Sequence, residues 1–201
     1  MMAGFHHITT VLFDLDGVIR HFDPEVTAEI ERRHGISDGR IMEIAFTGTA
    51  AEQLILGRLR RADWIAGIGA ALGAPDAASE WGAQGARLDE GVLALAAELR
   101  DAGIRTAILT NGTDGVRAEI DELGLSASFD PILNSAEIGF AKPDARVFAH
   151  VVEELGCAPE AVFFVDDSAT NVAGAIAAGL RAQHFTDAAG LRRALLADAR
   201  R

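Results

Sequence analysis

The feature that most constrains the fold is a short apolar run followed by a helical pattern, which recurs along the second half of the chain. β-Branched and aromatic runs predict strands, and apolar residues at three- and four-residue spacing predict helices between them. A strand-helix period of about 30 residues is typical of a parallel sheet with helices on both faces, an α/β fold. The expected strands are 8–13, 104–109, 131–133, 161–165 and 181–185, and the expected helices are 115–123, 145–155, 169–178 and 188–199.

The interval after the first strand breaks this period, because about 90 residues precede the next strand where a repeating unit needs about 30. Its apolar positions recur at helical spacing, which predicts a small helical bundle in which Trp64 and Trp81 pack. We therefore expect a helical cap at 21–85, inserted into a sheet domain made of 1–20 and 86–201. The expected cap helices are 24–34, 38–46, 50–56, 62–72 and 76–83.

Composition excludes several classes of protein. The chain of 201 residues carries a formal charge of −12, which disfavours nucleic-acid binding because the phosphate backbone requires a basic face. Its single cysteine, Cys157, cannot form an intramolecular disulfide, and no apolar run is long enough to span a membrane. The N-terminus has no secretory pattern, and His6 and His7 are not expected to bind a metal. We expect a cytoplasmic, soluble monomer or homodimer.

Two pairs of acidic residues follow predicted strands. Asp14 and Asp16 come directly after the first strand and precede Gly17, whereas Asp166 and Asp167 follow the strongly apolar fourth strand. Carboxylates brought this close repel one another unless a divalent cation or a lysine compensates their charge. The first pair alone is equally compatible with an ordinary surface loop or a fragment of a calcium loop. The second pair favours a functional site.

Three further polar residues follow the second and third strands. Thr110 and Asn111 precede a helix that Thr113 or Asp114 is expected to cap, which is typical of an anion-binding turn. Lys142 directly precedes Pro143, which suits the first position of the next helix. Taken alone, the first pair favours a plain Asn-Gly turn with a capping threonine, and a lone lysine favours a solvated side chain.

The combination of these motifs is more informative than any one of them. Ligands of open parallel sheets bind at the carboxyl ends of the strands, and all of these polar residues fall at or just after such ends. Acids for Mg²⁺, groups that bind phosphate oxygens and a lysine together predict a phosphoryl-transfer site.

The chain resembles the haloacid dehalogenase superfamily, which has a Rossmann-like fold, and within it the members whose helical cap follows the first motif. The resemblance spans nearly the whole chain. Its motifs are Phe13-Asp14-Leu15-Asp16-Gly17-Val18, Leu109-Thr110-Asn111-Gly112, Ile138-Gly139-Phe140-Ala141-Lys142-Pro143-Asp144, and Val165-Asp166-Asp167-Ser168 with Asn171, Gly174, Ala175 and Gly179.

The resemblance implies a role for each motif residue. Asp14 would be the nucleophile that forms an aspartyl-phosphate, and Asp16 the general acid and base. Thr110, the Asn111 amide and Lys142 would bind the phosphoryl group. Mg²⁺ would be held by Asp14 and Asp166, by the backbone carbonyl of Asp16 and, directly or through water, by Asp167.

The expected function is a Mg²⁺-dependent phosphatase that acts on a small phosphorylated metabolite, such as a sugar phosphate. A phosphomutase of the β-phosphoglucomutase type is the alternative, and a non-catalytic phosphate-binding module is disfavoured because every expected catalytic residue is present. Arg20, His21 and Phe22 lie where the chain leaves the site for the cap. They either contact the substrate's leaving group or form an ordinary hinge.

Overall fold

A computed structural model describes residues 8–198 and contains a five-stranded parallel sheet in the order β5-β4-β1-β6-β7. Each strand begins and ends within two residues of its predicted range. The bounds are β1 (Thr10–Phe13), β4 (Arg105–Thr110), β5 (Ile132–Asn134), β6 (Val162–Asp166) and β7 (Arg181–His184). Because β1 pairs with both β4 and β6, the residues that follow it lie at the middle of the sheet edge. His6 and His7 lie outside the described residues.

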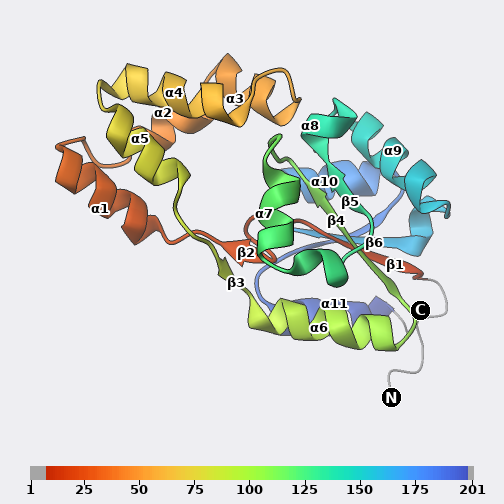
Figure 1. Cartoon of the computed structure of the whole chain (residues 1–201). Coiled ribbons are helices and arrows are strands. Elements are labelled where there is room, and N and C mark those ends of the chain that lie inside the picture. The colour runs from red at the N-terminus through yellow and green to blue at the C-terminus, as the bar shows by residue number, and fades with distance from the viewer. Residues whose placement is uncertain (1–7, 199–201) are drawn as a thin grey trace.

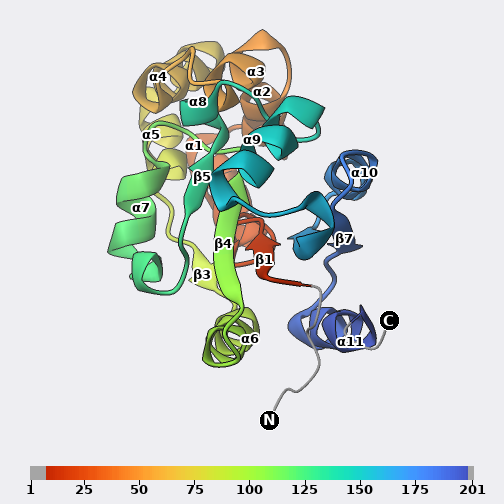
Figure 2. The same ribbon diagram turned by 90° about the vertical axis from the view of Figure 1, so that its right-hand side faces the viewer.

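Helices cover both faces of this sheet, as predicted (Figure 2). Successive residues of a strand point to opposite faces, so Val11 and Phe13 pack in one apolar cluster and Leu12 in the other. The first cluster includes residues of α6 (Glu90–Asp101), α7 (Val116–Glu122) and α11 (Ala188–Asp198). The second includes residues of α9 (Ala145–Leu155) and α10 (Ala169–Ala177).

The long interval after β1 contains five helices that pack around an apolar cluster of their own, which includes Trp64 and Trp81 (Figure 1). A short antiparallel ribbon of β2 (Arg20–His21) and β3 (Arg87–Leu88) joins this group of helices to the sheet. Strands of two residues carry no readable period, so the sequence did not predict them. The helices are α1 (Pro24–His34), α2 (Arg40–Phe46), α3 (Thr49–Ile55), α4 (Arg61–Leu72) and α5 (Pro75–Gly82).

The expected helix ranges also omitted α6 and three shorter helices, namely α8 (Ser135–Ile138), η1 (Leu125–Ala127) and η2 (Pro159–Ala161). None of the helices within residues 8–198 is both long enough and apolar enough to cross a membrane.

The predicted start of α9 at Ala145 is confirmed, but two predicted details of helix starts were wrong. Pro143 is not the first residue of a helix, because Asp144 accepts a hydrogen bond from the Arg146 backbone N–H at 2.9 Å and caps α9. Neither Thr113 nor Asp114 caps α7, which begins at Val116 after Gly115. Asp114 instead accepts a hydrogen bond from the Arg61 backbone N–H at 2.8 Å, a contact with the inserted helices that local sequence could not reveal.

Candidate active site

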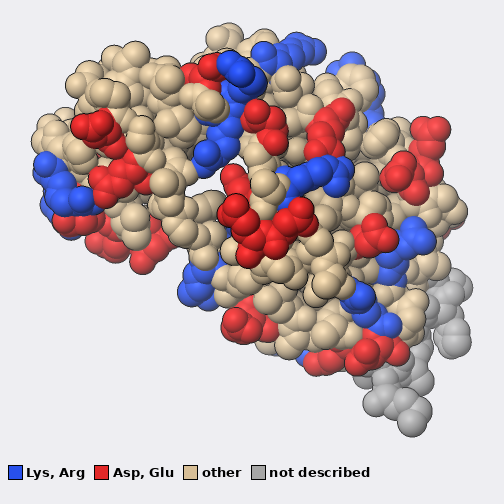
Figure 3. All heavy atoms as spheres, viewed as in Figure 1, with Lys and Arg blue, Asp and Glu red and all other residues tan. Residues whose placement is uncertain are grey.

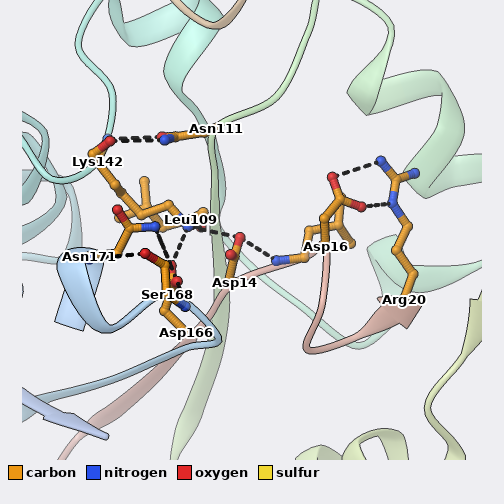
Figure 4. Close-up of polar contacts among 10 residues, drawn as sticks. Asp14, Asp16, Arg20, Leu109, Asn111, Lys142, Asp166, Ser168 and Asn171 are labelled. Carbon is orange, nitrogen blue, oxygen red and sulfur yellow. Dashed lines mark hydrogen bonds and ion pairs between the residues drawn. The ribbon is translucent and has the colours of Figure 1, made fainter. Parts of the chain in front are cut away.

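The polar residues predicted at the sheet edge come together where β1, β4 and β6 end (Figure 4). Asp14 follows β1 directly, Thr110 is the last residue of β4 and Asp166 is the last residue of β6. Lys142 reaches them from the loop between α8 and α9. All four are at least nine-tenths buried.

Lys142 lies between the two buried carboxylates. Its Nζ is 2.8 Å from Asp14 Oδ1 and 2.7 Å from Asp166 Oδ2, and it donates a third hydrogen bond to the Leu109 carbonyl at 3.0 Å. Burial opposes the charge of this ammonium group, but the two carboxylates outweigh it and raise the pKa of Lys142. Lys142 is also the chain's single lysine, a signal that the sequence analysis did not use. A compact ammonium group with three donors fits between three oxygens.

Asp14 is the second member of this cluster. Burial raises its pKa to about 7, although Lys142 favours the ionised form, and the nearby Asp166 carboxylate adds to the rise. The backbone N–H of Leu15 donates to Asp14 Oδ1 at 2.7 Å. Lys142 and this N–H therefore hold Oδ1 in place.

Asp166 is held from the other side by α10. The Ser168 backbone N–H donates to Asp166 Oδ1 at 2.8 Å, and Asn171 Nδ2 lies 3.1 Å from each carboxylate oxygen. Asn171 belongs to the fourth motif, but no role was predicted for it from the sequence. Its position in the first turn of α10, five residues after Asp166, was the available signal.

Three carboxylates form a group that suits a hard cation. Asp14, Asp166 and Asp167 each offer an oxygen, and these oxygens lie within 4.8 Å of one another. Carboxylate oxygens are the ligands that Mg²⁺ prefers, so the residues present fit this ion. Burial, and to a smaller extent Asp166, raises the pKa of Asp167.

Gly17 is required beside this group. Its φ of +87° disfavours other residues, and a Cβ there would lie 2.1 Å from Asp167 Oδ2.

Asp16 lies outside this three-carboxylate group, because its side chain points toward Arg20 on the side of Asp14 away from Lys142 (Figure 4). Arg20 Nε donates to Asp16 Oδ1 and Arg20 Nη2 to Asp16 Oδ2, the second at 3.4 Å. The same guanidinium donates to Glu119 Oε2 on α7 at 2.8 Å. Glu119 in turn lies 3.5 Å from Arg61 Nε on α4. Arg20 therefore links Asp16 to both α7 and the inserted helices, a role that sequence spacing did not indicate.

Asn111 uses its side chain to position the lysine loop. Its Oδ1 accepts from the Lys142 backbone N–H at 2.8 Å, and its Nδ2 donates to the Lys142 carbonyl at 2.9 Å. This reciprocal pair joins the end of β4 to the loop that carries Lys142.

A cavity of about 1050 Å³ lies between the inserted helices and the sheet edge. Asp16 and residues 111–113 line it on the side of the sheet, and Phe46, Trp64 and Trp81 line it on the side of the helices. Figure 3 shows the corresponding opening between the lobe at the left and the rest of the molecule.

A family model for haloacid dehalogenase-like hydrolases matches residues 8–179. The chain belongs to this family. Phosphatase MT3486 of Mycobacterium tuberculosis is 32% identical over 215 residues, covering 92% of this chain and 90% of that protein. A phosphoserine phosphatase of Halobacterium salinarum is 32% identical over 187 residues, covering 86% and 83%. Family membership and these relatives confirm the expectation of an enzyme of the phosphatase type.

Solved structures of this family share the fold. A family enzyme from Bacteroides thetaiotaomicron, solved with magnesium and inorganic phosphate, superposes with a TM-score of 0.74 at 23% identity. The superposition covers 90% of this chain and 95% of that one. It confirms the predicted Rossmann-like α/β fold with helices on both faces of a parallel sheet.

Proposed function

We propose that this family member is a Mg²⁺-dependent phosphatase that hydrolyses a small phosphomonoester through an aspartyl-phosphate on Asp14. One observation carries the proposal. The Asp14 carboxylate directly follows the central strand, 2.8 Å from the ammonium group of Lys142, and has an oxygen within 4.8 Å of oxygens of both Asp166 and Asp167. A nucleophilic carboxylate, a fixed cation and a ligand set for a hard metal ion are the components that phosphoryl transfer requires.

The metal would be held by Asp14 and Asp166, by the Asp16 backbone carbonyl and, directly or through water, by Asp167. When bound, Mg²⁺ supplies positive charge that orients the phosphoryl oxygens and offsets their charge. The cluster's oxygen-only ligand chemistry and the named relatives, which are phosphatases, support this assignment.

In the first step, a carboxylate oxygen of Asp14 attacks the phosphorus, and the bond from phosphorus to the ester oxygen breaks. Asp16 gives its proton to the leaving alkoxide, which departs as an alcohol. In the second step, Asp16 takes a proton from water while the water oxygen bonds to phosphorus and the bond between phosphorus and Asp14 breaks. Inorganic phosphate leaves, and Asp14 is again a free carboxylate.

Other residues would bind the phosphoryl group or position the reacting groups. Lys142, Thr110 and the backbone of Asn111 lie at the same sheet edge and would contact the phosphoryl oxygens. Arg20 would position Asp16, since its guanidinium contacts both oxygens of that carboxylate.

We also propose that residues 21–85 act as a cap on a sheet domain made of 1–20 and 86–201. Their separate apolar cluster and the cavity between them and the sheet edge support this division. A cap of this kind excludes bulk water while the site holds its substrate. The single cysteine, which cannot form an intramolecular disulfide, supports a location in the reducing cytoplasm.

The test is hydrolysis of an activated aryl phosphate with Mg²⁺ and with a chelator, in the wild type and in Asp14→Asn. We expect activity that requires the metal and is lost in Asp14→Asn. Asp101→Asn, which removes an exposed carboxylate at the end of α6, is the matched control and should keep full activity. Full activity in Asp14→Asn would overturn the covalent mechanism.

A further inference from the structure

The cavity beside the site collects exposed apolar side chains. Of the six large hydrophobic residues that are exposed in the described chain, three line this cavity. They are Phe22, Met42 and Phe46, with exposed fractions of 42%, 45% and 59%. Contiguous exposed apolar surface in a soluble protein marks a ligand or partner site.

The wall opposite the sheet edge is aromatic. Phe46 packs edge to face on Trp64 and Trp81, with ring centroids 6.0 and 6.2 Å apart, and the two indoles are 5.4 Å apart. Both tryptophans are buried in the cluster, whereas Phe46 remains accessible from the cavity. The cluster therefore presents a fixed apolar surface to whatever the cavity holds.

This surface is continuous with the proposed site. The same cavity is lined by Asp16, the proposed acid that protonates the leaving oxygen, and by residues 111–113 after β4. A phosphomonoester whose phosphoryl group lies at Asp14 directs its leaving group past Asp16 into this cavity. The apolar wall therefore faces the organic part of the substrate.

The charged side chains that line the cavity disfavour a substrate whose leaving group carries a second anionic group. Among the described residues, Arg20 and Arg61 are the cations that line it, and both lie within 4.0 Å of Glu119. Arg20 is further paired with Asp16. Both described cations of the cavity are therefore paired, and the lining acids also include Asp23 and Glu122, which disfavour a carboxylate or a second phosphate.

We infer that the substrates are phosphomonoesters of uncharged, apolar alcohols, alkyl or aromatic, and not those of hydroxy acids or bisphosphates. The inference rests on the proposed phosphatase function and narrows its substrate class. It follows from the aromatic wall, the paired cations and the continuity of the cavity with Asp16.

A series of n-alkyl phosphates from ethyl to octyl tests this inference, because their leaving groups differ in length and hardly in basicity. We expect kcat/KM to rise by about two- to fourfold for each methylene until the chain fills the apolar wall. Phosphoglycolate, which matches ethyl phosphate in size and adds a carboxylate, should be at least about tenfold worse than ethyl phosphate.

Phe46→Ala is the informative variant, because the Phe46 side chain is 59% exposed and its removal should leave the contact between the two buried indoles in place. It should reduce kcat/KM for octyl phosphate by about tenfold and flatten the dependence on chain length. Val26→Ala is the matched control, since Val26 is an exposed apolar residue of the same helical group that does not line the cavity. It should keep the steep dependence of the wild type.

Binding can be followed without turnover, because Trp64 and Trp81 are the chain's two tryptophans and both line the cavity. Alkyl phosphonates, titrated in the presence of Mg²⁺, should change the tryptophan emission with a Kd that falls as the alkyl chain grows. Hydrolysis with no dependence on chain length in either kcat/KM or Kd overturns this inference and leaves the phosphatase function standing. Failure to hydrolyse any ester overturns the phosphatase function, and with it the assignment of these ligands as substrates.

Discussion

Two networks of ion pairs meet at the first motif, and they differ in burial. Lys142 joins Asp14 and Asp166 in a network whose side chains are each less than one-tenth exposed. Arg20 joins Asp16 and Glu119, whose side chains are 46% and 30% exposed, and Glu119 extends this second network to Arg61 of the inserted helices. We call them the inner and the outer network.

The difference in burial predicts different free-energy costs for breaking the two networks. Removing one partner from a buried pair leaves an uncompensated charge in a medium of low dielectric constant. A partly exposed pair is screened by water and can exchange partners at little cost. The inner network therefore fixes the proposed nucleophile. The outer network connects the proposed acid, Asp16, through Arg20 and Glu119 to Arg61 of the inserted helices.

Lys142→Met should have the largest effect, because it leaves Asp14 and Asp166 facing each other without a cation. We expect kcat/KM to fall by about 10²- to 10³-fold and the metal-free protein to lose about 3–5 kcal/mol of unfolding free energy. Urea unfolding in a chelator measures the second quantity.

Lys142→Arg separates charge from shape, since the larger guanidinium keeps the charge and does not fit between three oxygens. Like Lys142→Met, the Lys142→Arg variant should therefore have a lower kcat/KM than the wild type. Arg117→Met, which breaks an exposed pair with Glu137, is the surface control and should cost less than about 1 kcal/mol. An equal loss in Arg117→Met and Lys142→Met would contradict the distinction between buried and exposed pairs.

The raised pKa of Asp14 predicts how stability depends on pH in the metal-free protein. Its carboxyl group keeps a proton up to about pH 7 when folded, against 3.8 for the unperturbed group. Between these values the folded state binds more protons than the unfolded state, so the free energy of unfolding falls as pH rises, by at most about 1.4 kcal/mol per pH unit. Asp14→Asn should lack this contribution. A difference between wild type and variant that stays constant from pH 4 to 7 would refute it.

Arg20→Met tests the outer network and should have a smaller effect than Lys142→Met. We expect a loss of about 1–2 kcal/mol in unfolding free energy, because two partly exposed carboxylates lose a cation. Turnover of an alkyl phosphate should fall by about tenfold, and turnover of an activated aryl phosphate by less, because only the alkyl leaving group needs a proton from Asp16. Arg61→Met removes the outer network's contact between Arg61 and Glu119 and leaves the pair of Arg20 and Asp16 in place. It should therefore lower the turnover of both esters equally and only weakly.

Gly17→Ala should lower the free energy of unfolding by about 1–2 kcal/mol, because its left-handed backbone disfavours alanine. Its added Cβ would also displace the Asp167 carboxylate, so we expect weaker Mg²⁺ binding in a calorimetric titration. Gly124→Ala is matched in backbone, with φ +70° and open space around its Cβ. It should show the same destabilisation with unchanged Mg²⁺ affinity.

The sequence predicted the inner network better than the outer one, for a physical reason. Parallel strands end at one edge, so a residue such as Asp166 could be placed beside Asp14 from strand positions alone. Arg20, by contrast, acts through Glu119 and Arg61, which are 99 and 41 residues away along the chain and approach it only once α4 and α7 are packed. The start of α7 was missed for the same reason, since Asp114 contacts α4.

The aromatic wall of the cavity could not be predicted from the sequence either. Helical spacing predicted that Trp64 and Trp81 pack inside the inserted helices, and they do. That spacing could not show that Phe46 would pack on both indoles and remain exposed at the cavity that Asp16 also lines, because this depends on how α2, α4 and α5 are oriented.

The central claim is that Asp14 carries the phosphoryl group. It is tested most directly by acid-quenching Asp16→Asn during reaction with an activated aryl phosphate and Mg²⁺, then measuring peptide masses. The aryl leaving group needs no proton, whereas hydrolysis of the intermediate needs the base, so this variant should accumulate the intermediate. We predict that the peptide containing Asp14 gains the mass of one phosphoryl group and that Asp14→Asn never does. Continued turnover with no phosphoryl group on that peptide at any time, together with activity in Asp14→Asn, would contradict the account.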